Sequence, residues 1–197
     1  MTAKILILAG STRKGAFSGH MAEAASKELA AQGASITHIS LADYPLPFMN
    51  EDLEAEEGIP ENAMKLGRLF AEHDGLMICS PEYNASIPAL LKNTIDWVSR
   101  ISKDGDKPLK PYAGLTVALC SPSNAPLPRP PPLHPLRAPL LHAATHIAPA
   151  QRSLPAPPPA SPPPDPPPPH RPPPLPPALP PPPTTPPLPP LPLRPPR

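Results

Sequence analysis

The chain of 197 residues has few aromatic side chains, few cysteines and no long apolar run. Its two cysteines, Cys79 and Cys120, each end an apolar run and lack the spacing of metal ligands. They are therefore interpreted as small core side chains, and no metal site is expected. The first apolar run, residues 5–9, is too short for a signal peptide, and no later run reaches the length of a membrane span. These absences predict a cytoplasmic protein that does not bind a membrane.

Glycine and lysine are absent after Ser121, where proline dominates. All nine glycines precede that residue, whereas 36 of the 43 prolines follow it. Charge divides there too, with 11 basic and 15 acidic side chains before Ser121 and six arginines and one acid, Asp165, after it. Six scattered arginines without aromatic neighbours do not make the concentrated basic face that nucleic acids require, so no nucleic-acid partner is expected.

Up to residue 121 the sequence alternates between strand-like and helix-like segments. Strands are predicted at residues 4–9, 35–41, 75–79 and 114–120, helices at 19–32, 60–71 and 89–101, and a loop at 43–58. The strands are nearly continuous apolar runs, which are typical of parallel sheets that helices cover on both faces. Their order predicts an α/β fold with a doubly wound parallel sheet.

The loop after the first strand is rich in hydrogen-bond donors. It reads Gly10-Ser-Thr-Arg-Lys-Gly-Ala-Phe-Ser18. Its amides, hydroxyls and guanidinium at the start of a helix suit a phosphate group, although a plain turn is the alternative. It is not a Walker loop, because Ala16 stands where that motif needs lysine.

The loop after the third strand places an aromatic ring, an amide and two prolines at the same sheet edge. It reads Ser80-Pro-Glu-Tyr-Asn-Ala-Ser-Ile-Pro88. A pre-shaped turn of this kind suits a flat ring system whose polar edge bonds to backbone groups and to Asn84. The alternative is that Pro81 and Pro88 only mark the ends of a strand and a helix, while Tyr83 covers the core.

These two loops, with Leu91-Lys-Asn-x-Ile-Asp-Trp97 after the second, resemble the NADPH-dependent FMN reductase family. The resemblance implies a flavodoxin-like fold, bound FMN, and NADPH or NADH as the electron source. Hydride would pass through flavin N5 to a quinone or similar small acceptor, so no catalytic side chain is expected. Homodimers or homotetramers are also implied. The implied cofactor-binding residues are Ser11, Arg13 and Ser18 for the phosphate, Pro81, Glu82, Tyr83 and Asn84 for the ring, and Ser121 for its far edge.

Two further residues bear on this interpretation. Family members often carry a hydroxyl where this chain has Ala16, which removes a hydrogen bond worth about 1 to 3 kcal/mol. Arg100 is a candidate for binding an anionic acceptor or the NADPH phosphate. Alternatively, Arg100 is a cation at the C-terminus of a helix, where its charge interacts favourably with the helix dipole.

The proline-rich part divides the chain into three predicted regions. Residues 1–121 form the FMN-binding domain, 122–154 a degraded remnant of the same domain, and 155–197 a disordered proline-rich tail. Proline lacks the amide that a strand or helix needs, so no fifth strand is expected from residues 155–197. Residues 133–142 and 145–151 keep a faint similarity to the family's fourth helix and fifth strand. Degradation of these elements would leave Val117 and Leu119 at an uncovered edge.

Two alternatives to an active reductase remain open. The patterns Arg171-x-x-Pro174-x-x-Pro177 and Pro189-x-x-Pro192-x-Arg194 match ligands of SH3 or WW domains, which would make the chain an interaction protein. The second alternative is that the chain is an inactive remnant, whose proline-rich part results from a truncation or a sequencing error.

Overall fold

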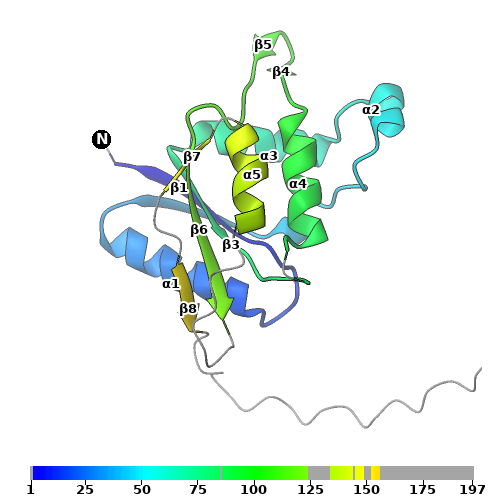
Figure 1. Cartoon of the computed structure of the whole chain (residues 1–197). Coiled ribbons are helices and arrows are strands. Elements are labelled where there is room, and N and C mark those ends of the chain that lie inside the picture. Colours follow the sequence, from blue (N-terminus) through cyan, green and yellow to red (C-terminus); the bar gives the residue numbers. More distant parts are fainter. Residues whose placement is uncertain (1, 85, 124–133, 144, 149–151, 156–197) are drawn as a thin grey trace, which may run out of the picture. The chain divides into compact units, whose positions relative to one another are not determined.

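The computed structural model describes residues 2–84, 86–123, 134–143, 145–148 and 152–155 (Figure 1). All of them belong to the first of two units, Met1–Pro158. The predicted disordered tail and both SH3-type patterns lie outside the described residues, apart from Pro155. Within the described ranges, no helix is long and apolar enough to cross a membrane.

Four parallel strands form the main part of the sheet. They are β1 (Lys4–Ala9), β2 (Ser35–Ile39), β3 (Gly75–Cys79) and β6 (Thr116–Ser123), in the order β2-β1-β3-β6. The predicted doubly wound parallel sheet is confirmed. Only the ends of the strands differ from the prediction, and β6 continues past Cys120 to Ser123.

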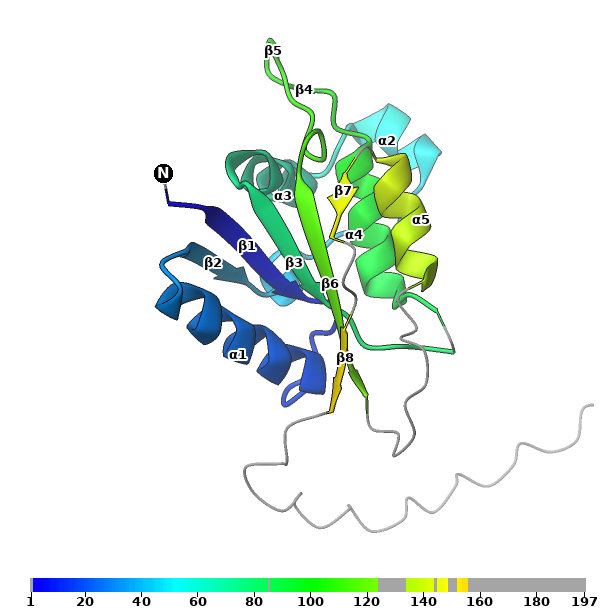
Figure 2. The same ribbon diagram turned by 60° about the vertical axis from the view of Figure 1, so that its left-hand side comes forward.

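Helices cover the two faces of the sheet unequally. Helix α1 (Phe17–Ala31) lies on one face, and α3 (Glu61–Glu72), α4 (Ala89–Ser99) and α5 (His134–His142) lie on the other (Figure 2). Strand β1 shows why the sheet has two cores. Its Leu6 and Leu8 pack in the larger core with α3, α4 and α5, whereas the alternate residues Ile7 and Ala9 pack against α1.

Shorter elements occupy the connections. They are the 3-10 turn η1 (Leu41–Asp43), helix α2 (Glu51–Glu57), and the hairpin of β4 (Lys103–Asp104) with β5 (Lys107–Pro108). The prediction of a loop over residues 43–58 was wrong at α2. This helix buries no residue, so its sequence lacks the apolar periodicity by which the other helices were predicted. Its start is stabilised by the Asn50 side chain, which accepts a hydrogen bond from Asp52 N (2.9 Å).

The sheet continues beyond residue 121. Strands β7 (His146–Ile147) and β8 (Arg152–Pro155) both pair in parallel with β6, on the side away from β3. The register shifts by two residues between them, because Val117 faces Ile147 whereas Cys120 faces Arg152. The edge expected to be uncovered is paired at Val117, which lies opposite Ile147, and Ala148 N donates to the Val117 carbonyl (2.9 Å). No described residue pairs with Leu119 on this side, although its side chain is buried.

Helix α5 is compatible with its prolines. Its buried residues Leu136 and Leu140 lie one helical turn apart and pack in the larger core. Pro135 lies in the first turn, where a missing amide costs nothing. Pro139 lies inside the helix, and its carbonyl still accepts a hydrogen bond from Ala143 N (3.0 Å). Helix α5 thus packs in the larger core, and β7 and β8 extend the sheet beyond β6.

Candidate functional site

The carboxyl ends of β1, β3 and β6 lie side by side at one edge of the sheet. Ala9 faces Cys79, and Cys79 faces Cys120. The next residues keep the strands together, because Gly10 N donates to the Cys79 carbonyl (2.9 Å) and Ser80 N donates to the Cys120 carbonyl (2.8 Å). The loops that follow β1 and β3 therefore begin at one place, beside the last residues of β6, as expected for a ligand site in a doubly wound sheet.

Gly10 has little space around it. A Cβ atom there would lie 3.2 Å from Leu91 Cδ2, 3.2 Å from Ser80 Oγ and 3.3 Å from Pro81 Cδ. The first and second loops are packed against each other at this point. A ligand that contacts both loops would meet a surface whose shape is already set.

The first loop turns sharply into α1. Gly15 has a φ of 66°, which favours glycine, and α1 begins at Phe17 after Ala16. Ala16 offers no side-chain cap, and the first turn of the helix carries no acid. Arg13 is exposed, and Arg13 N donates to Ser11 Oγ (3.3 Å). The loop thus presents a cation and the partial positive charge of a helix N-terminus, which favour an anion.

Ser18 is the unusual residue of this loop. Its side chain lies in the first turn of α1, the residue is only 1% exposed, and Ser18 Oγ has no hydrogen-bond partner among the described residues. A buried hydroxyl without a partner costs about 1–3 kcal/mol. A phosphate oxygen would remove this cost by accepting the hydrogen bond, so the loop fits the phosphate of FMN.

The second loop is a closed turn. Tyr83 and Ser86 exchange backbone hydrogen bonds of 3.2 and 3.0 Å, and Asn84 adopts a φ of 53° inside the turn. Asparagine tolerates this left-handed conformation better than most residues. Ser80 Oγ donates to the Pro81 carbonyl (2.9 Å) and holds the start of the loop. The side chains of the next three residues, Glu82, Tyr83 and Asn84, are exposed and free to contact a ligand.

The third loop follows β6, and Ser121 lies within that strand, two residues before its end. Ser121 is buried, and its hydroxyl lies 3.5 Å from the Pro122 carbonyl. Residues 124–133, which would continue this loop, lie outside the described residues. The structure thus brings seven of the predicted residues to one sheet edge from the first two loops and the start of α1, and Ser121 from β6.

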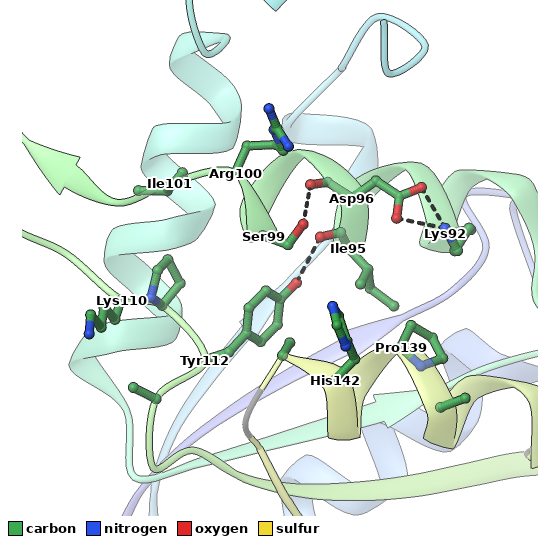
Figure 3. Close-up of a pocket in the computed structure, with 14 residues that line it drawn as sticks. Lys92, Ile95, Asp96, Ser99, Arg100, Ile101, Lys110, Tyr112, Pro139 and His142 are labelled. Atoms are coloured by element: carbon green, nitrogen blue, oxygen red, sulfur yellow. Dashed lines mark hydrogen bonds and ion pairs between the residues drawn. The ribbon is translucent and has the colours of Figure 1, made fainter. Parts of the chain in front are cut away.

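Arg100 is not brought to this edge. Helix α4 connects the parallel strands β3 and β6, so it runs antiparallel to them and ends at the opposite edge. There Arg100 Nε donates to Glu54 Oε2 (2.8 Å), and Glu51 Oε1 lies 3.9 Å from Arg100 Nη1. Arg100 also lines a cavity of about 700 Å³ between α4, α5 and Tyr112 (Figure 3). A role in binding NADPH stays a prediction, and the pairing with α2 favours the alternative of a structural cation.

Two motif residues without an assigned role turn out to hold a neighbouring segment. Trp97 Nε1 and Asn93 Nδ2 both donate to the Pro47 carbonyl (2.8 Å each), and Asn93 Oδ1 accepts from Met49 N (2.8 Å). Sequence reasoning placed both residues in the motif but gave no signal for these contacts, because their partners lie more than 40 residues away. The segment between Pro47 and Met49 is fixed to α4 and presents Phe48 to solvent.

The described residues contain no group of three or more His, Cys, Asp or Glu side chains that could hold a metal ion. Both ring nitrogens of His73 contact neighbouring groups of the fold. Its Nδ1 lies 2.6 Å from the Leu69 carbonyl, and its Nε2 lies 2.8 Å from Thr37 Oγ1. These contacts join the end of α3 to β2.

Comparison with known proteins identifies relatives of residues 3–126. The family model described as NADPH-dependent FMN reductase matches this range. A quinone reductase of Escherichia coli K12 is 38% identical over 116 residues, which cover 59% of this chain and 57% of that protein. A 2-hydroxy-1,4-benzoquinone reductase of a Burkholderia species is 36% identical over 100 residues, covering 51% and 52%. The chain therefore spans about half the length of the curated relatives it matches.

Solved structures extend the likeness beyond residue 126. FerB from Paracoccus denitrificans, a flavoenzyme NAD(P)H:(acceptor) oxidoreductase, superposes with a TM-score of 0.61 at 25% identity, over 77% of this chain and 78% of that one. An NAD(P)H:quinone oxidoreductase from Methanothermobacter marburgensis gives a TM-score of 0.60 at 16% identity, over 82% and 90%. The second likeness shows the shared fold alone.

Proposed function

Because the chain belongs to the NADPH-dependent FMN reductase family, we propose that it binds FMN and transfers hydride from NADPH or NADH to a quinone or similar small acceptor. The names of its relatives support a quinone as acceptor. The observation that carries FMN binding is the buried Ser18 hydroxyl at the start of α1, which has no hydrogen-bond partner in the part of the chain that the structure describes.

Different parts of this edge would bind different parts of FMN. In this proposal Ser11, Arg13 and Ser18 bind the phosphate, and Ser121 lies at the far edge of the ring. Pro81, Glu82, Tyr83 and Asn84 lie against the ring, whose N5 atom supplies the hydride chemistry once FMN is bound. Because this chemistry needs no side-chain nucleophile, the residues act by positioning the ring and by excluding water from one of its faces.

The first experiment compares FMN with riboflavin, which lacks the phosphate. The purified chain should bind FMN, turn yellow and oxidise NADPH or NADH faster when 1,4-benzoquinone is added. Riboflavin should bind about 10- to 100-fold more weakly, because it cannot form the charge-assisted hydrogen bonds of the first loop. Fluorescence quenching titration measures both affinities, and absorbance at 340 nm follows turnover.

A matched variant makes this test specific. In Arg13→Ala the preference for FMN over riboflavin should shrink, while riboflavin affinity stays near that of the wild type. Equal binding of FMN and riboflavin by the wild type, or NADPH oxidation that does not depend on added FMN and quinone, would contradict the proposed function.

We also propose that the chain assembles as a homodimer or homotetramer. The family resemblance suggests assembly, and the segment fixed by Asn93 and Trp97 supplies a candidate contact. Phe48 is 82% exposed there, and the neighbouring α2 has no buried residue. Large aromatic side chains that a rigid segment presents to solvent are typical of the centres of interfaces.

The Phe48→Ser variant should therefore associate more weakly, with a dissociation constant raised by about tenfold or more. Its fold should not change, because the ring contributes little to the core. Light scattering after size exclusion measures the oligomeric state over a dilution series, and Phe48→Trp, which keeps the apolar surface, is the control. A Phe48→Ser variant that dissociates at the same concentration as the wild type would exclude this contact.

A further inference from the structure

The two cysteines of the chain meet on neighbouring strands. Cys79 ends β3, Cys120 lies in β6, and the parallel register places them directly opposite each other. Both belong to the small core under α1, so their side chains leave the same face of the sheet. Neighbouring strands lie about 4.7–4.9 Å apart. This separation falls inside the range of about 4.4–6.8 Å between Cα atoms that disulfides span.

We propose that Cys79 and Cys120 are a redox-active dithiol, which a small quinone or another two-electron oxidant converts into a disulfide between β3 and β6. Both thiols are free in the structure. The site lies next to the candidate FMN site but does not depend on it, because the electrons come from the thiols themselves.

The reaction balances without any further reactant. The two S–H bonds break, one S–S bond forms, and two electrons and two protons pass to the quinone, which becomes a hydroquinone. Cys120 is 9% exposed whereas Cys79 is fully buried, so the oxidant reaches Cys120 first. The Cys120 thiolate bonds to a heteroatom of the oxidant. Cys79 then attacks the Cys120 sulfur, which forms the S–S bond and breaks the bond to the oxidant, and the reduced oxidant leaves with the electron pair. The short distance between the strands allows this without a large movement of the backbone.

The electrostatics of the pair favour the same order. A hydrogen bond between the thiols lowers the pKa of Cys120, while this hydrogen bond and burial raise the pKa of Cys79. Cys120 is therefore the thiol that loses its proton more readily. The thiolate is the reactive form of cysteine, so the more exposed sulfur is also the better nucleophile.

A disulfide at this position would act on the edge that carries the loops. Ser80 N already donates to the Cys120 carbonyl, and Ser121 follows Cys120 directly. Joining Cys79 to Cys120 covalently would fix the start of the second loop relative to the part of β6 that carries Ser121. Oxidation would therefore alter the edge at which the second loop begins and Ser121 lies.

The test uses the full chain, because its sequence has only these two cysteines. The FMN-free protein is treated with diamide, which oxidises thiols without adding to carbon, and in parallel with 1,4-benzoquinone. We expect intact mass spectrometry of the monomer to show the loss of two hydrogen atoms, reversed by dithiothreitol. A peptide map without reductant should show the peptide with Cys79 joined to that with Cys120.

The variants Cys79→Ala and Cys120→Ala are the matched controls, since each keeps one thiol and should show no such loss of mass. Unchanged thiols in the wild type, a disulfide between two chains, or a quinone adduct on one cysteine without an internal disulfide would overturn the proposal. The peptide map of the wild type decides the matter even if a variant fails to fold. Because no flavin is present, failure here leaves FMN binding untouched, and failure to bind FMN leaves the dithiol untouched.

Discussion

The Ser18→Ala variant should be more stable than the wild type without FMN and should bind FMN about 10- to 100-fold more weakly. Both effects have one cause. The wild type buries a hydroxyl that has no hydrogen-bond partner in the described residues, and alanine removes this group at almost no loss of volume. The free energy of unfolding of the FMN-free protein should rise by about 1 kcal/mol. The same hydroxyl would bond to a charged phosphate, an interaction worth about 1.5–3 kcal/mol.

The prediction is specific because stability should rise while FMN affinity falls. Urea unfolding without FMN measures stability, and a fluorescence titration measures FMN affinity. Ser26→Ala is the control on the same helix, because Ser26 Oγ already donates to the Ala22 carbonyl (2.7 Å) and faces no ligand loop. FMN affinity should be unchanged in that variant. A Ser18→Ala protein that binds FMN as tightly as the wild type would remove Ser18 from the phosphate site.

The sequence predicted the two ligand loops because their residues are contiguous. Gly10 to Ser18 and Ser80 to Pro88 each follow a strand, and the parallel order of the strands brings both loops to one edge. The lack of a partner for the Ser18 hydroxyl is different, because it depends on what packs around α1. Arg100 shows a related limit: the parallel order of the strands already sets the direction of α4, but the pairing of Arg100 with Glu54 depends on how α2 packs.

Elements without an apolar pattern escaped prediction. Helix α2 has acids through most of its length and buries none of its side chains, so nothing in its sequence has helical periodicity. The hairpin of β4 and β5 turns at Gly105, whose φ of 58° suits glycine, but its strands are too short for a pattern. In both cases only capping and turn residues indicate the element in the sequence, because neither element has a pattern of buried apolar residues.

Helix α5 combines prolines with a regular apolar pattern. Leu136 and Leu140 are spaced by one helical turn, and both are buried against the larger core. Their packing stabilises a helix that proline at position 139 weakens by itself. Tertiary packing therefore outweighs local propensity in this segment, and a count of prolines does not show it.

The Leu140→Ala variant tests this conclusion and should lose about 2–5 kcal/mol of stability, a large part of the total for a domain of this size. Leu140 is fully buried, so alanine would leave a cavity between α5 and the sheet. Leu141→Ala is the matched control: the adjacent residue is 54% exposed, and the same truncation should change stability by less than about 0.5 kcal/mol. Chemical unfolding followed by Trp97 fluorescence measures both. If the two variants unfolded at the same denaturant concentration, α5 would not be part of the core, and β6 would need another cover for Val117 and Leu119.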